Sequence, residues 1–199
     1  MRDRRRAQTA RDITGAALDL FARKGFDATT ADEIAQGAGV SRATFFNYFP
    51  QKELILAEFA RSRMERVQSV LEEHSEASLD SLLDLFSEFA AENERLGSQL
   101  RALLPHIMLR PACQAAVQPM IQGAQQVLAR SLSRSGELKT GVDPRVFAES
   151  FFGLYIVTTL QWAVHPKPPK GWHKRAMRQR LGQLVSLARI APSKRRNSP

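Results

Sequence analysis

The sequence predicts an all-α protein with two parts, an N-terminal unit of three helices and a larger helical domain. Apolar residues recur three and four positions apart along most of the chain, which is the period of a helix with one buried face. Capping residues, glycines and prolines mark the ends of these segments. No segment of convincing strand length alternates polar and apolar residues, and no internal repeat is visible.

Three short helices are expected in the first 50 residues. The first ends at Lys24, and Gly25 follows as a residue that readily adopts the left-handed conformation closing a helix. The second begins with a T-x-x-E capping box, in which Glu33 reaches back to Thr30. Ser41 caps the third. The apolar face of the first helix comprises Ile13, Ala16, Ala17, Leu20 and Phe21.

The second and third helices are expected to cross at a tight turn. Gly39 lies in the turn, where a positive φ is needed, and the small side chain of Ala35 permits a close approach. This is the pattern of a helix-turn-helix, although small-residue turns also join helices in ordinary bundles. The apolar residues at the expected contact are Ile34, Ala38, Val40, Phe45 and Tyr48.

The rest of the chain is expected to fold into longer helices. Pro50 precedes a helix of about residues 51–74, and Asp143-Pro144 is a good N-cap and N1 pair for a strongly apolar helix to Val164. Pro105 and Pro119 lie inside two other apolar patterns, where each should kink or end its helix. The final helix carries Met177, Leu181, Leu184, Val185 and Ala188 on one face.

The net charge of +9 is unevenly distributed. Residues 1–66 carry twelve basic and nine acidic side chains (net +3), residues 67–165 seven and eleven (net −4), and residues 166–199 ten and none (net +10). Arg4, Arg5 and Arg6 cluster ahead of the expected first helix. Such clusters are either solvated tails or arms that contact nucleic acid. Residues 191–199 are expected to form a basic disordered tail.

Other classes of protein find little support. The single cysteine, Cys113, excludes an internal disulfide. The apolar run 146–164 contains Glu149 and Gln161, which indicates a buried helix and no membrane partner. The four histidines lie far apart, and no nucleophile, phosphate-loop or dinucleotide motif is present. We therefore expect a cytoplasmic protein that is not an enzyme and has no metal site and no cofactor.

The stretch from Ile13 to Leu56 resembles the N-terminal domain of the TetR (tetracycline-repressor) family of bacterial transcription factors. The matching pieces are L-F-A-R-K-G-F with a following T-T, then I-A-x-x-A-G-V-S, then Y-F-P-x-K-E-L, in the right order with the right gaps. The resemblance implies a helix-turn-helix DNA-binding domain in residues 1–50. It also implies an effector-binding and dimerisation domain in residues 51–190.

The resemblance makes Ser41–Tyr48 the recognition helix. Arg42 and Thr44 are then expected to face base edges or adjacent phosphates, and Lys52 is expected to pair with a phosphate. Phe46 departs from the family pattern, because many members have a phosphate-bonding tyrosine there. The full set of DNA-contacting residues expected is Arg4, Arg5, Arg6, Thr30, Ser41, Arg42, Ala43, Thr44, Asn47, Tyr48 and Lys52.

The resemblance also implies three partners: double-stranded operator DNA with a pseudo-palindromic sequence, a second copy of the chain, and a hydrophobic or aromatic effector. The last two helices are expected to form the homodimer interface. The residues expected to bind the effector are Phe86, Phe89, His106, Met108, Met120, Tyr155 and Trp162.

Three functions remain open at this point. The first is a homodimeric repressor that its effector releases from DNA. The second is a DNA-binding regulator without a small-molecule effector, or an activator, in which the aromatic residues simply fill a core. The third is a helical enzyme with an unrecognised site, which would require titratable groups that converge in one cleft.

Overall fold

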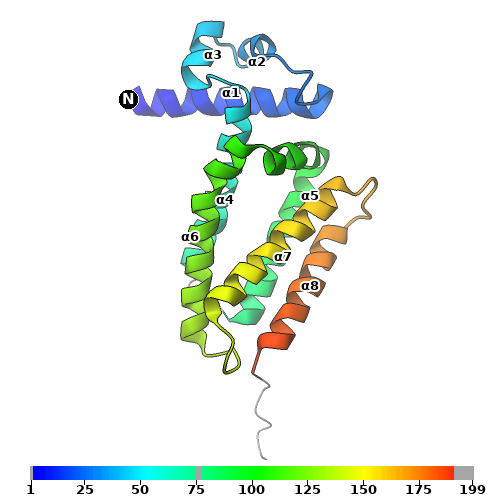
Figure 1. Ribbon diagram of the computed structural model, residues 1–199. Helices are drawn as coiled ribbons and strands as arrows, with labels where there is room; N and C mark the ends of the chain where they lie inside the picture. Colours follow the sequence, from blue (N-terminus) through cyan, green and yellow to red (C-terminus); the bar gives the residue numbers. More distant parts are fainter. Residues whose placement is uncertain (1, 75–77, 191–199) are drawn as a thin grey trace, which may run out of the picture.

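The computed structural model describes residues 2–74 and 78–190, and these residues are almost entirely helical (Figure 1). The only β-type pairing in the described ranges is an isolated bridge between Leu138 and Arg189. The expected all-α fold is therefore confirmed. The helices are α1 (Arg2–Lys24), α2 (Ala31–Gly37), α3 (Arg42–Tyr48), α4 (Glu53–Glu73), α5 (Leu79–Leu109), α6 (Pro111–Ser135), α7 (Pro144–Val164) and α8 (Trp172–Ala188).

Helices α1–α3 form a small head at one end of the molecule (Figure 1). Its core contains Phe21 and Phe45, which are 1% and 0% exposed. The same cluster includes Ile55 and Leu56 of α4 and Leu103 of α5. The core of the head therefore continues past residue 50, where the sequence placed a domain boundary.

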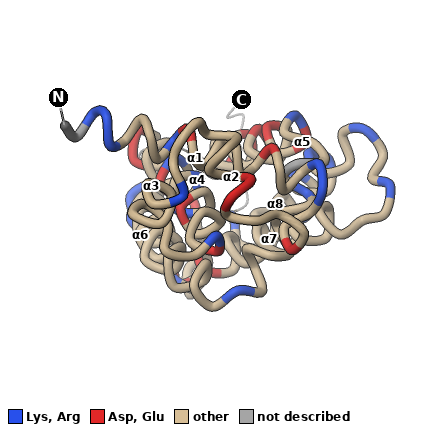
Figure 2. The backbone as a smooth tube through the Cα atoms, turned by 90° about the horizontal axis from the view of Figure 1, so that it is seen from above, with Lys and Arg blue, Asp and Glu red and all other residues tan. Residues whose placement is uncertain are grey.

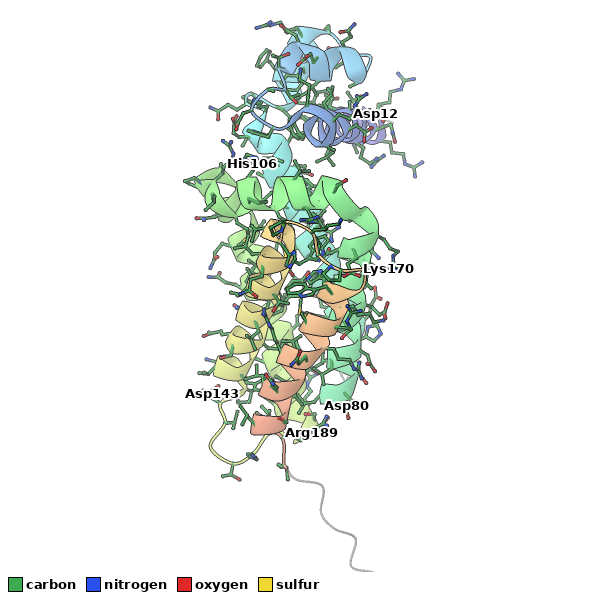
Figure 3. The ribbon with its side chains drawn as sticks, turned by 90° about the vertical axis from the view of Figure 1, so that its right-hand side faces the viewer. Asp12, Asp80, His106, Asp143, Lys170 and Arg189 are labelled. Carbon is green, nitrogen blue, oxygen red and sulfur yellow. The ribbon has the colours of Figure 1, made fainter. Side chains whose placement is uncertain are left out.

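Helices α4–α8 form the body, a bundle that extends away from the head (Figures 1 and 3). Its main cluster is built from α4 to α8 around the fully buried Phe86, Phe151 and Phe152. Helix α4 belongs to both parts, because its first turns enter the core of the head and Val67 and Leu71 enter the core of the body.

Helix α5 is broken at Gly97, whose φ of 61° and ψ of −134° are not helical. A residue with a Cβ rarely adopts a positive φ, so glycine suits this break. The part after Gly97 turns across the top of the bundle and lies beneath α1 (Figure 1). This segment, residues 98–109, therefore separates the head from the interior of the body.

The structure corrects two expectations about helix boundaries. Pro105 and Pro119 were expected to kink or end their helices; both lie inside α5 and α6, so neither ends its helix, and the non-helical residue inside α5 is Gly97. The basic cluster Arg4–Arg6 is not an arm ahead of the first helix, because α1 already begins at Arg2. The proposed disordered tail 191–199 lies outside the described residues. Within the described ranges, no helix combines the length and the hydropathy needed to cross a bilayer.

Candidate DNA interface and ligand cavity

Reciprocal hydrogen bonds fix the start of α2. The backbone amide of Thr30 donates to Oε2 of Glu33 at 2.8 Å, and the amide of Glu33 donates to Oγ1 of Thr30 at 3.3 Å. The hydrogen bond from Lys24, together with those from Thr30, lowers the pKa of Glu33 to about 2. The expected capping box is therefore confirmed, and Thr30 has a structural role in the head.

Helix α3 is capped as expected and is held from below by one aromatic side chain. The amide of Thr44 donates to Oγ of Ser41 at 3.0 Å, and Gly39 takes the positive φ, 66°, that the turn requires. Phe45 is fully buried and anchors α3 in the head. The opposite face of α3 is exposed. Among the predicted contacts on α3, Arg42, Ala43 and Asn47 are exposed, while Thr44 and Tyr48 are half-buried.

The exposed face of α3 also carries Phe46, which is 38% exposed. The guanidinium of Arg42 lies 5.4 Å from the centre of this ring and also pairs with the exposed Asp32 of α2. The sequence singled Phe46 out only as a departure from the family pattern. The structure adds it to the surface that surrounds Arg42.

Figure 2 views the molecule from the side of the head, with basic positions near the N-terminus; Arg42 is the basic residue of α3. Arg4, Arg5 and Arg6 are exposed on the first turns of α1. The guanidinium of Arg6 lies 6.0 Å from the ring centre of Tyr48, at the end of α3. The structure thus brings the N-terminal basic cluster beside the predicted recognition helix, although as helix and not as an arm.

The ammonium group of Lys52 makes all of its hydrogen bonds to other groups of the protein. Its Nζ donates to the carbonyl oxygens of Phe26, Asp27 and Thr29 at 2.9, 3.2 and 2.9 Å, and lies 4.6 Å from the ring centre of Phe26. These contacts use all three donors of an ammonium group. Lys52 therefore ties α4 to the α1–α2 loop, and its position does not support the predicted phosphate contact.

Phe26 also receives contacts from the body. The guanidinium of Arg110 lies 4.2 Å from the Phe26 ring centre and pairs with Asp27 at 3.3 Å. The ring of His106 lies 5.3 Å from that of Phe26. His106 was expected to bind an effector, but it does not line the cavity described below. It lies in the junction between head and body (Figure 3), on the side of α5 away from the cavity described next.

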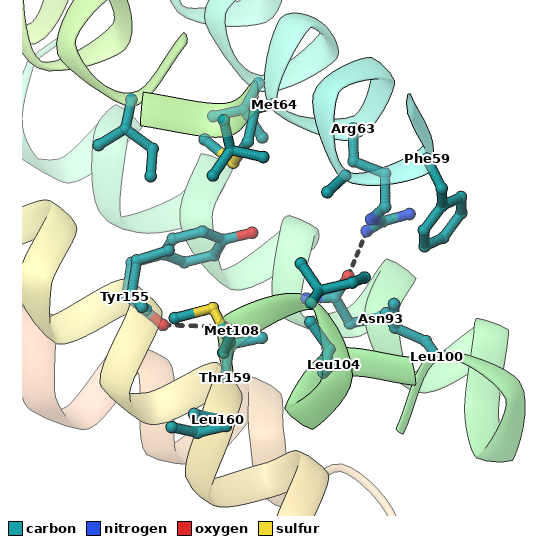
Figure 4. Close-up of a pocket in the computed structure, with 16 residues that line it drawn as sticks. Phe59, Arg63, Met64, Asn93, Leu100, Leu104, Met108, Tyr155, Thr159 and Leu160 are labelled. Atoms are coloured by element: carbon teal, nitrogen blue, oxygen red, sulfur yellow. Dashed lines mark hydrogen bonds between the residues drawn. The ribbon is translucent and has the colours of Figure 1, made fainter. Parts of the chain in front are cut away.

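A cavity of about 90 Å³ lies in the body, bounded by α4, α5, α6 and α7 (Figure 4). Its lining is mostly apolar and includes Met108 and Tyr155, two of the residues expected to bind an effector. The other lining residues are Phe59, Ala60, Arg63, Met64, Val67, Asn93, Leu100, Leu104, Ile107, Val117, Ile121, Ile156, Thr159 and Leu160.

Besides His106, four further predicted effector residues do not line this cavity. Phe86 is fully buried, with the rings of Phe89, Phe151, Phe152 and Tyr155 within 4.9–5.6 Å of its own. These close aromatic contacts make Phe86 and Phe89 part of the solid core, as the alternative interpretation held.

The remaining two lie elsewhere for different reasons. Met120 is half-buried on α6, outside the cavity lining. The ring of Trp162 stacks on that of His173, with centres 4.8 Å apart and planes within 8°. Helical periodicity identified residues that turn inward, but it did not indicate which of them border a gap.

The sequence analysis missed the polar residues of the cavity. Arg63 donates to Oδ1 of Asn93, which is 1% exposed. Burial raises the pKa of Tyr155, against the opposing charge of Arg63 and a hydrogen bond with Asn93. Arg63 resembles any surface arginine in the sequence, and only the approach of α5 to α4 reveals its position.

A further polar pair connects the cavity wall to α8. Oγ1 of Thr159 donates to the carbonyl oxygen of Tyr155 at 2.8 Å, which leaves Nε2 of His173 as the donor in its 3.2 Å contact with Thr159. Burial lowers the pKa of His173 to about 4, partly offset by the carbonyl of Ala90. His173 is therefore neutral near neutral pH.

An exposed second helix of a helix-turn-helix, carried on a helical body with an apolar cavity, defines the class of a helix-turn-helix transcriptional regulator. Residues 13–59 match the family described as bacterial regulatory proteins of the TetR family. The N-terminal part of the chain is therefore a TetR-family DNA-binding domain.

Relatives resemble the chain along most of its length. A mycofactocin biosynthesis transcriptional regulator, MftR, of Mycobacterium tuberculosis is 29% identical over 162 residues, which cover 80% of this chain and 82% of the relative. A fatty acid metabolism regulator protein of Bacillus subtilis is 26% identical over 161 residues, covering 77% and 82%. The solved structure of the TetR-family repressor FadR of Thermus thermophilus with lauroyl-CoA is 26% identical, has a TM-score of 0.65 and covers 92% and 98%.

Proposed function

We propose that the protein is a homodimeric repressor that reads an operator with α3 and leaves it when an apolar small molecule enters the body. The single observation that supports DNA readout best is the exposed face of α3, held out by the Ser41 cap and by Phe45. A rigid, exposed helix of this kind fits a major groove. Arg42 and Thr44 are the proposed base-reading residues, flanked by Ala43, Asn47 and Tyr48.

The proposed DNA surface extends to α1 and α2. Arg4, Arg5 and Arg6 supply positive charge beside α3, where they can contact phosphates. Arg42 pairs with Asp32 in the structure, and this exposed ion pair is weak enough to be exchanged for a contact with DNA. Thr30 flanks the groove-facing helix on the other side.

The proposed homodimer rests on an exposed apolar stripe along α7. Val146, Val157 and Val164 are 59%, 49% and 58% exposed, and the small Gly153 lies between them on the same face. Leu187 of the neighbouring α8 is 73% exposed. Contiguous exposed apolar faces of paired helices favour a protein partner, and a second copy would create a two-fold axis.

The operator is then a pseudo-palindrome with half-sites ~34–36 Å apart, or a multiple of this distance. Sedimentation of a monomer at micromolar concentration would contradict the dimer.

The proposed effector site is the cavity of the body. The relative from Thermus thermophilus was solved with lauroyl-CoA, a ligand with a long apolar chain, which supports an apolar effector here. Residues 98–109 supply Leu100 and Leu104 to the cavity and Leu103 to the core of the head. A ligand that widens the cavity would therefore displace a segment in direct contact with the head. Such a ligand changes the affinity for DNA only if it binds the conformation with residues 98–109 displaced more tightly than the conformation in the structure.

One observation favours the second candidate, a regulator without a small-molecule effector. The cavity of about 90 Å³ is well below the ~300 Å³ of the smallest ligand pockets. An effector must therefore move side chains such as Met64 and Met108, which are flexible enough to do so. A ligand screen in which no compound lowers operator affinity would favour this candidate.

Genome-wide footprinting followed by operator binding of variants tests the DNA function. Arg42→Ala and Thr44→Ala should each lose about 1–3 kcal/mol of discrimination for every contacted base pair. Arg134→Ala is the matched control, because it removes an exposed arginine at the far end of α6. Operator affinity that is unchanged in both α3 variants would overturn the assignment of α3 as the recognition helix.

A further inference from the structure

The lining of the cavity is not uniformly apolar. Side chains of Met64, Leu104 and Ile121 and their neighbours surround most of it, whereas Arg63 and Asn93 meet at one end (Figure 4). Tyr155 and Thr159 add hydroxyl groups on the α7 side. A cavity with one charged corner and an apolar remainder matches a ligand with one polar end.

Arg63 differs from its neighbours on α4. Arg61 pairs with Glu58 and Glu65, and Arg66 pairs with Glu92 at 2.9 Å. The ion pairs of the described residues include none that involves Arg63. Arg63 is thus the arginine of this helix that faces the cavity with an amide, and not a carboxylate, as its hydrogen-bond acceptor.

The surroundings of Arg63 leave hydrogen-bonding capacity unused. Its Nη2 donates to Asn93, and its guanidinium lies 5.8 Å from the ring centre of Phe59. A guanidinium has five N–H donors arranged to meet a carboxylate with two parallel bonds. Burial of the group disfavours its charged form, and a bound anion would offset that cost.

We infer that the cavity binds an amphipathic monocarboxylate, with its carboxylate on Arg63 and its apolar chain among the methionine, leucine and isoleucine side chains. This inference rests on the proposed effector function and names the chemical class of the effector. Because the whole cavity is about 90 Å³, the chain of such a ligand enters by displacing Met64, Leu104 or Met108. Asn93 positions the guanidinium, because it accepts from Nη2.

The test compares a charged ligand with uncharged ligands of the same chain length. Decanoate, decanol and decanamide are titrated calorimetrically into the full-length protein and into Arg63→Met, Arg63→Lys and Arg66→Met. The wild-type protein should prefer decanoate about ten- to a hundredfold, as expected for a charged hydrogen-bonded pair. Arg63→Met should abolish this preference, and Arg63→Lys should retain part of it, because lysine keeps the charge but not the planar fork.

Arg66→Met is the matched control, since Arg66 lies on the same helix, is exposed and is already paired with Glu92. It should keep the preference within about twofold. Because the preference is a ratio measured within one variant, a change in stability does not imitate the result. Equal binding of decanoate and decanol to the wild type would overturn this inference and leave the effector site standing. Failure of all three ligands to bind would overturn both this inference and the proposed effector site.

Discussion

The head and the body differ in the sequence separation of the residues that their polar contacts join. In the head, the decisive polar contacts join residues three apart, as between Thr30 and Glu33 or between Ser41 and Thr44. In the body, Arg63 and Asn93 are 30 residues apart, and Arg101 contacts the carbonyl of His165 from a distance of 64 residues. Local contacts leave a recognisable sequence motif, whereas distant contacts do not. The capped helices of the head were therefore predictable, and the cavity of the body was not.

Glycine positions show the same contrast. Gly25 and Gly39 of the head have φ values of 88° and 66°, at the helix end and the turn where the sequence placed them. Gly97 of the body has no flanking signal of a helix end, and its break was missed in favour of Pro105. A proline within a helix removes one donor, but packing can keep the helix continuous around it.

The largest expected effect tests the buried histidine of the body. The pKa of His173 is lowered from 6.5 in the unfolded chain to about 4 in the folded protein. Between these values the unfolded state binds more protons, so stability is fully present above pH 6.5 and falls with decreasing pH. The expected slope is about 1.4 kcal/mol per pH unit, or about 3 kcal/mol over the whole range.

Denaturant unfolding at a series of pH values measures this slope, and the range from about 6.5 to about 5 avoids most carboxylate titration. His173→Gln is the control, because an amide can still donate to Thr159 but does not titrate. A wild-type slope no steeper than that of His173→Gln would contradict a neutral, buried His173.

The second prediction compares the effects on stability of replacing a glycine in the body and a glycine in the head. Gly97→Ala should destabilise the protein by about 1–3 kcal/mol, because alanine is strained at a φ of 61° and ψ of −134°. Gly15→Ala should stabilise it by about 0.5–1 kcal/mol, because Gly15 is helical and exposed. Apart from chain neighbours and the backbone of the same helix, no heavy atom lies within 4 Å of the Cβ that either substitution adds, so backbone conformation decides the sign. Thermal unfolding measures both changes in stability. Changes of the same sign would contradict the non-helical backbone at Gly97.

The smallest expected effect concerns Lys52, where the structure and the family resemblance disagree. If Lys52 only ties α4 to the α1–α2 loop, Lys52→Met should leave the salt dependence of operator binding unchanged. If Lys52 contacts a phosphate, the slope of log affinity against log salt should fall by about one. Arg6→Met is the comparison, because Arg6 is exposed beside α3 and should reduce the slope.

The sequence by itself determined the all-α fold, the capping box of α2 and the N-cap of α3. These features depend on neighbouring residues, whose spacing is fixed by the geometry of a helix. Periodicity also identified the inward-facing residues of the body, including Phe86, Met108 and Tyr155.

Only the tertiary structure decided which inward-facing residues fill the core and which line the cavity. Phe86 meets four aromatic rings and belongs to the core, while Met108 and Tyr155 border the cavity. The break at Gly97 directs residues 98–109 across the bundle, which places His106 against Phe26 and leaves the cavity beneath. The approach of α5 to α4 gave Arg63 an amide partner in a cavity wall. A gap is the difference between the volume that several helices enclose and the volume of their side chains, so no single segment of sequence contains it.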